Sequence, residues 1–268
     1  PLNLLGVVIL TSLGTWGLPQ MIGKFYAIKD EKSINTGTVI STLFAIVISG
    51  GCYFLGGFGR LFDSAEIYNA ETGAVVYDSI IPSMLSKLPD ILIGIVVVLV
   101  LSASMSTLSS LVLTSSSTMT LDLLKDNIMK EMSEKKQIIT MQILIVFFIV
   151  VSVVIALDPP TFIAQLMGIS WGALAGAFLA PFLYGLYWKG VTRAGVWAGF
   201  IAGVGITVSN MFIGYIASPI NAGAAAMVAG LVIVPLVSLV TPKLKKEDVD
   251  EIFTCYEEKV VSTKKRNL

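Results

Sequence analysis

The sequence predicts an all-α polytopic membrane protein with about seven transmembrane helices, and three observations support this fold class. Hydrophobic residues make up 55% of the chain, charged residues only 13%, and the mean hydropathy is +0.84. Ordinary globular chains carry about 25% charged residues. The apolar residues gather in seven runs, most of them long enough for the ~20 helical residues that cross a ~30 Å hydrocarbon core. No run carries a charge in its middle.

The seven runs define the expected organisation of the chain. They cover residues 2–23, 38–57, 91–121, 138–157, 162–188, 194–217 and 222–240. We therefore assign residues 1–241 to a transmembrane region. Residues 242–268 mix Lys and Glu with few apolar residues and are expected to form a charged, partly helical cytoplasmic tail.

The distribution of Lys and Arg orients these helices. All but two of the 18 Lys and Arg residues lie in every second gap between the runs or in the tail; Arg60 and Lys87 are the exceptions. Cytoplasmic loops are enriched in Lys and Arg. We therefore expect a multi-pass protein of the cell membrane with its N-terminus outside and its C-terminus in the cytoplasm. Glu66 and Asn69 should lie outside, and Ser133 inside.

The start of the chain indicates a truncated protein. Pro1 directly precedes the first run, without an initiator Met or a basic signal segment. An outside-facing start at this point requires an earlier span to have delivered it there. We expect an N-terminally truncated piece whose partners are the lipid bilayer and the missing N-terminal helices of the same protein.

The residue types argue against an enzyme. The chain has no His, which excludes a Ser-His-Asp triad or an imidazole metal site within it. No span carries a carboxylate in its middle, and Cys52 and Cys255 have neither a metal-ligand spacing nor a disulfide framework. No nucleotide-binding glycine fingerprint occurs, and we expect no nucleic-acid partner.

The first run is interrupted. Two glycines and Pro19 fall within Ser12–Gln20, at the depth of the membrane centre. A proline lacks an amide donor and frees a carbonyl about one turn earlier, which is tolerated where protein, water or ligand satisfies the opened backbone. A discontinuous helix is the usual indication of a transporter's solute site. The alternative is a simple proline kink with a packed Trp16.

The second and third runs are joined by the one long outside connection, residues 60–90. Residues 69–73 are expected to form a turn, and residues 80–88 a short amphipathic helix. This connection should form an ordered cap on the outer face.

The third run carries an almost continuous series of hydroxyl side chains. At helical spacing, one face holds five of them: Ser102, Ser106, Ser109, Ser110 and Ser117. A small hard cation such as sodium takes several oxygen ligands, which two hydroxyls and backbone carbonyls could supply without a full charge in the membrane. The alternative is that these hydroxyls bond to carbonyls of their own helix or of a neighbouring one.

The remaining runs are separated by short gaps. The gap at residues 126–137 is charged, and the prolines of Asp158–Pro160 end one helix and open the next. The fifth run contains Gln165, either a mid-helix polar residue one turn before Gly168 or a cap of the helix start.

Several of these segments resemble a known family. Residues 103–110, followed by Ser115–Ser117 and Asp122, are similar to the signature of the sodium:solute symporter family. Residues 16–20 with 24–27 resemble the family's glycine-proline break and its basic exit, and residues 185–189 before Ala194 resemble another recurrent turn. The resemblance covers nearly the whole chain except the tail, and is nearest to the proline/pantothenate branch.

The resemblance implies a fold and a sodium site. Family members have a leucine-transporter-type fold of two inverted repeats of five helices, and seven spans with an outside start correspond to the second repeat plus two trailing helices. The family's sodium ligands correspond here to the hydroxyls of Ser106 and Thr107 and to the carbonyl of Ala103. Na⁺ would be the transported coupling ion, with further ligands from the absent first repeat.

The resemblance also suggests where a solute binds. The broken first helix and the fifth run offer the following lining residues: Ser12, Thr15, Trp16, Gly17 and Gln165. No Tyr or Asn cluster precedes Trp16, which argues against a sugar, whereas Leu18 and Met21 are less polar than proline transporters favour. We therefore expect a small organic solute: an amino acid such as proline, pantothenate or a small carboxylate.

Two alternatives to a sodium-coupled symporter remain. A passive channel needs a continuous polar lining, whereas the hydroxyls here concentrate on one span. A nonfunctional structural fragment is the other alternative.

Overall fold

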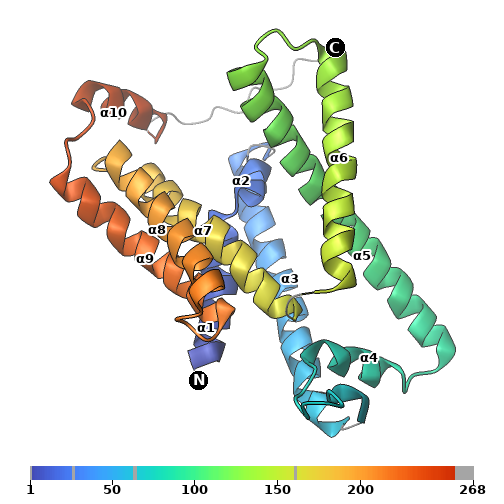
Figure 1. Cartoon of the computed structure of the whole chain (residues 1–268). Coiled ribbons are helices and arrows are strands. Elements are labelled where there is room, and N and C mark those ends of the chain that lie inside the picture. Colours follow the sequence, from blue (N-terminus) through green and yellow to red (C-terminus); the bar gives the residue numbers. More distant parts are fainter. Residues whose placement is uncertain (1, 26–27, 63–64, 160–161, 257–268) are drawn as a thin grey trace. The chain divides into compact units, whose positions relative to one another are not determined.

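The computed structural model describes residues 2–25, 28–62, 65–159 and 162–256 (Figure 1). The chain forms two compact units: residues 1–50 with 163–268, and residues 51–162. We refer to them as the first and the second unit. The described residues are helical apart from turns, loops and one isolated antiparallel bridge between Tyr68 and Val75.

All seven predicted spans are present as helices. The first run forms α1 (Leu2–Gly14), a 3₁₀ turn η1 (Thr15–Gly17) and α2 (Pro19–Phe25); the others are α3 (Glu31–Phe58), α5 (Asp90–Ser117), α6 (Glu134–Leu157), α7 (Ile163–Tyr187), α8 (Arg193–Ile213) and α9 (Pro219–Val240). Among the described residues, six helices are long and apolar enough to cross a membrane, or seven if the bent α1–α2 pair counts as one span. An all-α polytopic membrane protein is therefore confirmed.

Two helices extend furthest beyond their apolar runs, α3 at its start and α5, with its π-helical continuation, at its end. α3 begins seven residues before the run at residue 38, because the Asp30 carboxylate accepts a 2.7 Å hydrogen bond from the Ser33 amide and caps the polar first turn. Hydrogen bonds from the Ser33 side chain and, to a lesser extent, from this backbone amide lower the pKa of Asp30 below its ordinary value. α5 continues into a π-helix, η5 (Thr118–Ile128).

Glycine allows three helices of the first unit to pack closely. α7 carries Gly168, Gly172 and Gly176 at four-residue spacing, and buries all three. A Cβ on Gly172 would lie 2.5 Å from the Cα of Gly223 in α9. Such small-residue stripes let membrane helices approach without the bulk of side chains. α1 joins this core through Leu10, which is fully buried beside Met227 of α9.

The second unit consists of the end of α3, the connection between α3 and α5, and the α5–α6 hairpin. The buried residues of α5 and η5, Val112, Ser116 and Thr120, lie four residues apart on one face, and α6 is the main packing partner of α5. The connection contains the predicted turn, with Gly73 at φ 66°. It also contains α4 (Ile80–Leu85), shorter than the expected 80–88.

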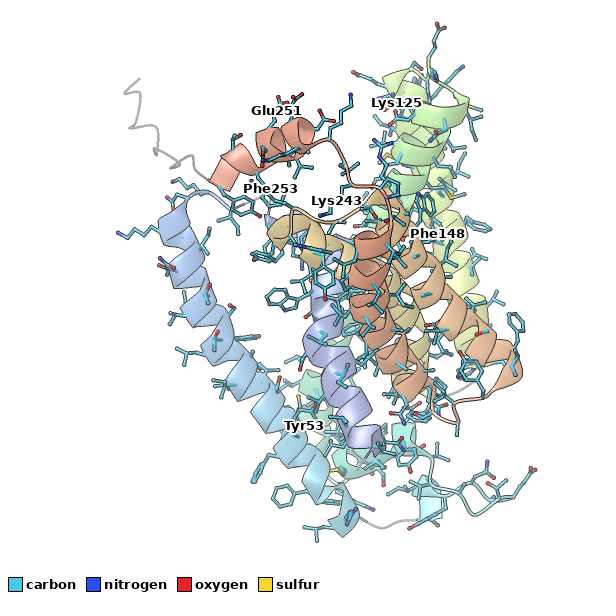
Figure 2. The ribbon with its side chains drawn as sticks, turned by 90° about the vertical axis from the view of Figure 1, so that its left-hand side faces the viewer. Tyr53, Lys125, Phe148, Lys243, Glu251 and Phe253 are labelled. Atoms are coloured by element: carbon cyan, nitrogen blue, oxygen red, sulfur yellow. The ribbon has the colours of Figure 1, made fainter. Side chains whose placement is uncertain are left out.

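The last α-helix of the described chain contacts the loop that follows α7. α10 (Lys246–Phe253) follows α9, and its Asp250 accepts a 2.7 Å hydrogen bond from Lys189 in the α7–α8 loop. The Lys189 ammonium also lies 5.3 Å from the centre of the Phe253 ring. Phe253 and Glu251 project from different sides of α10 (Figure 2). The helix is therefore held to the loop by one of its faces; residues 257–268 of the expected tail lie outside the described residues.

Candidate solute and sodium sites

The first helix is broken as the glycines and Pro19 predicted. α1 and α2 meet at an angle of 53°. Leu18 between them has an extended backbone (φ −86°, ψ 117°), and its carbonyl accepts the amide hydrogens of Met21 and Ile22 that begin α2. Pro19 has no amide hydrogen to offer the carbonyl of Thr15. The sequence alternative of a simple kink is excluded, because the helix is interrupted rather than bent.

Close packing against α7 explains why position 17, at the break, is a glycine. Gly17 is buried, and a Cβ there would lie 2.8 Å from the Cα of Ala175 and 2.8 Å from the Cβ of Leu179. Leu18 beside it is also buried. Gly17 therefore brings the broken segment against the α7 backbone.

A groove of about 740 Å³ runs between the broken helix and the second half of α7. Its walls are mostly apolar and aromatic, with two hydroxyl groups and one ammonium group. They are formed by Thr15, Trp16, Met21, Ile22, Lys24, Phe25, Phe182, Leu183, Leu186 and Tyr187. This volume falls in the range of small-molecule sites, about 300–1,000 Å³. The arrangement suits a solute with an apolar body and a negatively charged group.

The structure brings together only part of the expected solute site. Thr15 and Trp16 line the groove, and the Trp16 side chain is 57% exposed. Ser12 is exposed on α1, outside the groove lining. Gln165 is the third residue of α7, so it lies in the first turn rather than in the middle of the helix, and is half-buried.

No sequence motif indicated the groove's second wall. Phe182, Leu183 and Leu186 of α7 read as ordinary apolar span residues, and only helix packing shows that they face the break. Lys24 appeared only as one of several basic loop residues. Because α7 is apolar on all sides, its periodicity marks no face that would have indicated the groove.

The three expected sodium ligands share one face of α5 in the second unit. Ala103, Ser106 and Thr107 stand three and four residues apart, and all three are exposed. The Thr107 hydroxyl donates a 3.1 Å hydrogen bond to the Ala103 carbonyl. The Ser106 hydroxyl has no hydrogen-bond partner among the described residues. No group of three or more Cys, Asp or Glu that could hold a metal was found in the described part of the chain.

Other hydroxyls of α5 donate to carbonyls of their own helix, which is the alternative to cation binding stated in the sequence analysis. Ser109 donates to Met105, Thr114 to Ser110, and Ser116 to Val112, with donor-to-carbonyl distances of 2.7–2.8 Å. These bonds satisfy the hydroxyls within their own helix. Back-bonding thus accounts for part of the hydroxyl series, while Ser106 keeps both lone pairs available.

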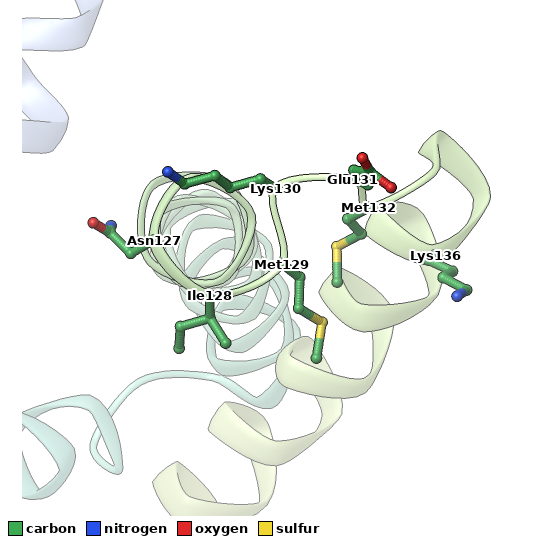
Figure 3. Close-up of a pocket in the computed structure, with 7 residues that line it drawn as sticks. All are labelled: Asn127, Ile128, Met129, Lys130, Glu131, Met132 and Lys136. Carbon is green, nitrogen blue, oxygen red and sulfur yellow. The ribbon is translucent and has the colours of Figure 1, made fainter.

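A second cavity, of about 530 Å³, lies at the turn between η5 and α6 (Figure 3). Two lysines line it, but Lys130 and Lys136 point away from each other in the close-up. The Met129 and Met132 side chains occupy the space between the turn and α6. The ammonium groups therefore do not converge on a common ligand.

The fold and these sites define a class. A chain of about seven apolar helices, one of them broken beside a groove and another with an oxygen-rich face, has the features of a secondary transporter. Residues 1–203 match the model of the sodium:solute symporter family, and the chain belongs to this family.

Individual relatives agree with this assignment. The chain is 32% identical to the sodium/pantothenate symporter of Haemophilus influenzae over 199 residues, covering 74% of this chain and 40% of the relative. It is 28% identical to the sodium/proline symporter of Staphylococcus aureus over 258 residues, covering 92% and 49%.

These matches bear on the protein class and on how much of the relatives' length the chain spans. The relatives are transporters and not enzymes, in agreement with the sequence expectation. The chain spans less than half the length of these curated relatives. No solved structure gives a significant match.

Proposed function

We propose that this chain forms part of a sodium-coupled symporter of a small organic solute, in the cell membrane. The observation that carries the proposal is the family match over residues 1–203, which contains both the broken helix and the Ala103–Thr107 motif. The names of the relatives extend the proposal to sodium as the coupling ion.

The sodium ligands in this chain are, in the proposal, the hydroxyls of Ser106 and Thr107 and the carbonyl of Ala103. Three oxygens are fewer than a hard cation takes, about six or more for calcium. The remaining ligands would come from the portion of the relatives' length that this chain does not span. The chain would then be the second inverted repeat of a leucine-transporter-type fold with two trailing helices, and would need the first repeat for transport.

The solute in the proposal is a small carboxylate with an apolar body, such as proline, another amino acid or pantothenate. The groove beside Trp16 supports this choice, because its walls are apolar and Lys24 is the one charged residue in its lining. Thr15 and Tyr187 offer the hydroxyls of the lining, although in this conformation the Thr15 hydroxyl donates a 3.4 Å hydrogen bond to the Ser12 carbonyl. A sugar, with hydroxyls on every side, would leave most of its hydrogen bonds unmade here.

Charge bias supports the proposed orientation, with the start of α1 and the α3–α5 connection outside and α10 in the cytoplasm. A passive channel finds less support. The α5 hydroxyls that a polar lining would need are bonded within their own helix at three positions, Ser109, Thr114 and Ser116.

Thermal stabilisation of the full-length protein tests the proposal. A ligand that binds only the folded state at 100 times its Kd stabilises that state by about 2.7 kcal/mol. We expect sodium together with proline, pantothenate or another small carboxylate to raise the unfolding temperature more than either alone. Potassium should not replace sodium. Stabilisation by a sugar alone, or the same response in potassium, would contradict the proposal.

A further inference from the structure

A third cavity, of about 430 Å³, lies within the connection between α3 and α5. It is enclosed by the end of α3, the turn η2 (Gly59–Leu61), the Tyr68–Val75 bridge, η4 (Tyr77–Ser79) and the start of α4. These short elements lie together at the lower end of the second unit in Figure 1. Neither the groove beside Trp16 nor the sodium motif on α5 contributes to it.

The cavity is built by specific backbone contacts. Asn69 and Ala74 close the turn through a 2.9 Å hydrogen bond, and the Val76 amide donates to the Ile67 carbonyl at 2.7 Å. Gly59 lets α4 approach, because a Cβ there would lie 2.8 Å from the Cγ2 of Ile80. The lining side chains are therefore held by a folded segment rather than by a loose loop.

The polar groups of the cavity are an arginine and two tyrosines. Arg60 lies in η2, and among the described side chains its guanidinium has no ion-pair partner. Tyr68 and Tyr77 add phenol groups to the lining, and the Tyr77 ring packs against Phe162 with centroids 5.4 Å apart. The rest of the lining is aliphatic, from Ile67, Val75 and Ile80.

This lining fits one kind of ligand. A guanidinium binds a carboxylate through two parallel N–H donors, the Tyr77 phenol can donate to the same group, and the aliphatic wall can cover an apolar body. The surrounding connection is acidic, because its sequence contains Asp63, Glu66, Glu71, Asp78 and Asp90 against only Arg60 and Lys87. Such a field opposes a multiply charged anion such as phosphate more strongly than a single carboxylate.

We propose that this cavity is a binding site for a small monocarboxylate, separate from the groove beside Trp16. It would hold the solute on the face that the charge bias places outside, before the solute reaches the groove. This role rests on the proposed symport of a carboxylate solute. Binding in the cavity itself does not require sodium, because none of the sodium motif lines it.

Two glycines of α3 offer a matched pair of variants. Gly56 lines the cavity and Gly57 does not, and a Cβ at either position meets nothing within 4 Å. Gly56→Leu should place an apolar side chain in the cavity lining, starting from a Cβ that has open space around it. Gly57→Leu adds the same side chain to the same helix and serves as the control.

The experiment measures equilibrium binding of pantothenate and of L-proline to the full-length protein, with and without sodium. A weak sodium-independent component is expected in the wild type. Arg60→Gln and Gly56→Leu should each weaken it about tenfold or more, and Gly57→Leu should leave it unchanged. Pantothenol, which has a hydroxymethyl group in place of the carboxylate, should not compete, and neither should phosphate.

The outcomes separate this inference from the proposed function. Absence of sodium-independent binding of both probes would overturn it. So would sodium-independent binding in Arg60→Gln or in Gly56→Leu that is as strong as in the wild type, or competition by pantothenol. Failure of the symport proposal would instead appear as the absence of any sodium-dependent component in the wild type. A Trp16→Ala variant should weaken only that sodium-dependent component.

Discussion

The hydroxyl of Thr107 donates a hydrogen bond to the carbonyl of Ala103, with the two oxygens 3.1 Å apart. Both atoms are expected sodium ligands, and the bond holds them on the same side of α5 as Ser106. A cation arriving at this face would take the Thr107 hydroxyl oxygen through its lone pairs while the hydroxyl proton turns away. The helix thus places these two oxygens side by side, as the proposed sodium site requires.

Removing either hydroxyl should therefore weaken sodium coupling. In the full-length protein, Ser106→Ala or Thr107→Ala should raise the sodium concentration for half-maximal uptake about tenfold, equivalent to about 1.4 kcal/mol. Thr114→Ala removes a hydroxyl bonded in the same way to Ser110 but outside the motif, and should have little effect. Unchanged sodium dependence in both motif variants, at normal protein level, would refute the ligand assignment.

The groove predicts a role for Trp16 in solute binding. Trp16→Ala removes an aromatic wall and should raise the KM for the transported solute about tenfold while the sodium dependence persists, because the α5 hydroxyls are untouched. Trp197→Ala is the matched control, since Trp197 is exposed on α8 and does not line the groove. Undiminished solute affinity in Trp16→Ala would place the solute elsewhere.

Gly17 should behave as a packing residue. Gly17→Ala forces a methyl group toward the α7 backbone at Ala175, and overpacking of this kind costs about 1–3 kcal/mol of stability. Gly23→Ala in α2 meets nothing within 4 Å and should be neutral. Thermal unfolding of both variants measures the difference. If Gly17→Ala were fully stable but had a raised KM for the solute, Gly17 would be a residue of the solute site rather than a packing residue.

Membrane orientation can be tested with single cysteines in a background without Cys52 and Cys255. Glu71→Cys, in the α3–α5 turn, should react with an impermeant thiol reagent added outside, whereas Ser133→Cys should react only after permeabilisation. Glu71 is preferable to Asn69 because the Asn69 side chain accepts the Glu71 and Thr72 amides that form the turn. Equal labelling of both sites from outside would refute the expected orientation.

The contact of α10 with the α7–α8 loop should depend on charge. Lys189→Ala or Asp250→Asn should expose α10 to faster proteolysis than in the wild type, and so should high salt, which screens exposed pairs. Glu251→Gln is the control. The hydrogen bond from Lys189 lowers the pKa of Asp250 below its ordinary value of 3.8. The contact should therefore persist above that value and be lost as the pH falls through the lower pKa of the folded state.

The amino-acid sequence was sufficient for the fold class, the spans and the break. The seven apolar runs correspond to the seven spans because a bilayer fixes helix length and forbids unpaired backbone, so a local pattern determines a local structure. Pro19 predicted the interruption for the same reason: a missing amide donor is a property of one residue. The α5 signature and the family assignment likewise follow from residues adjacent in the chain.

Tertiary structure decided which of these residues meet. It placed Gly17 against Ala175, and Phe182 and Leu186 opposite Trp16, although about 160 residues separate them in sequence. It also placed Arg60 and Tyr77 in the lining of one cavity, which no sequence motif indicated. Such contacts depend on how helices and turns pack across long stretches of chain, and uniformly apolar spans carry no periodic signal that would mark the packed face.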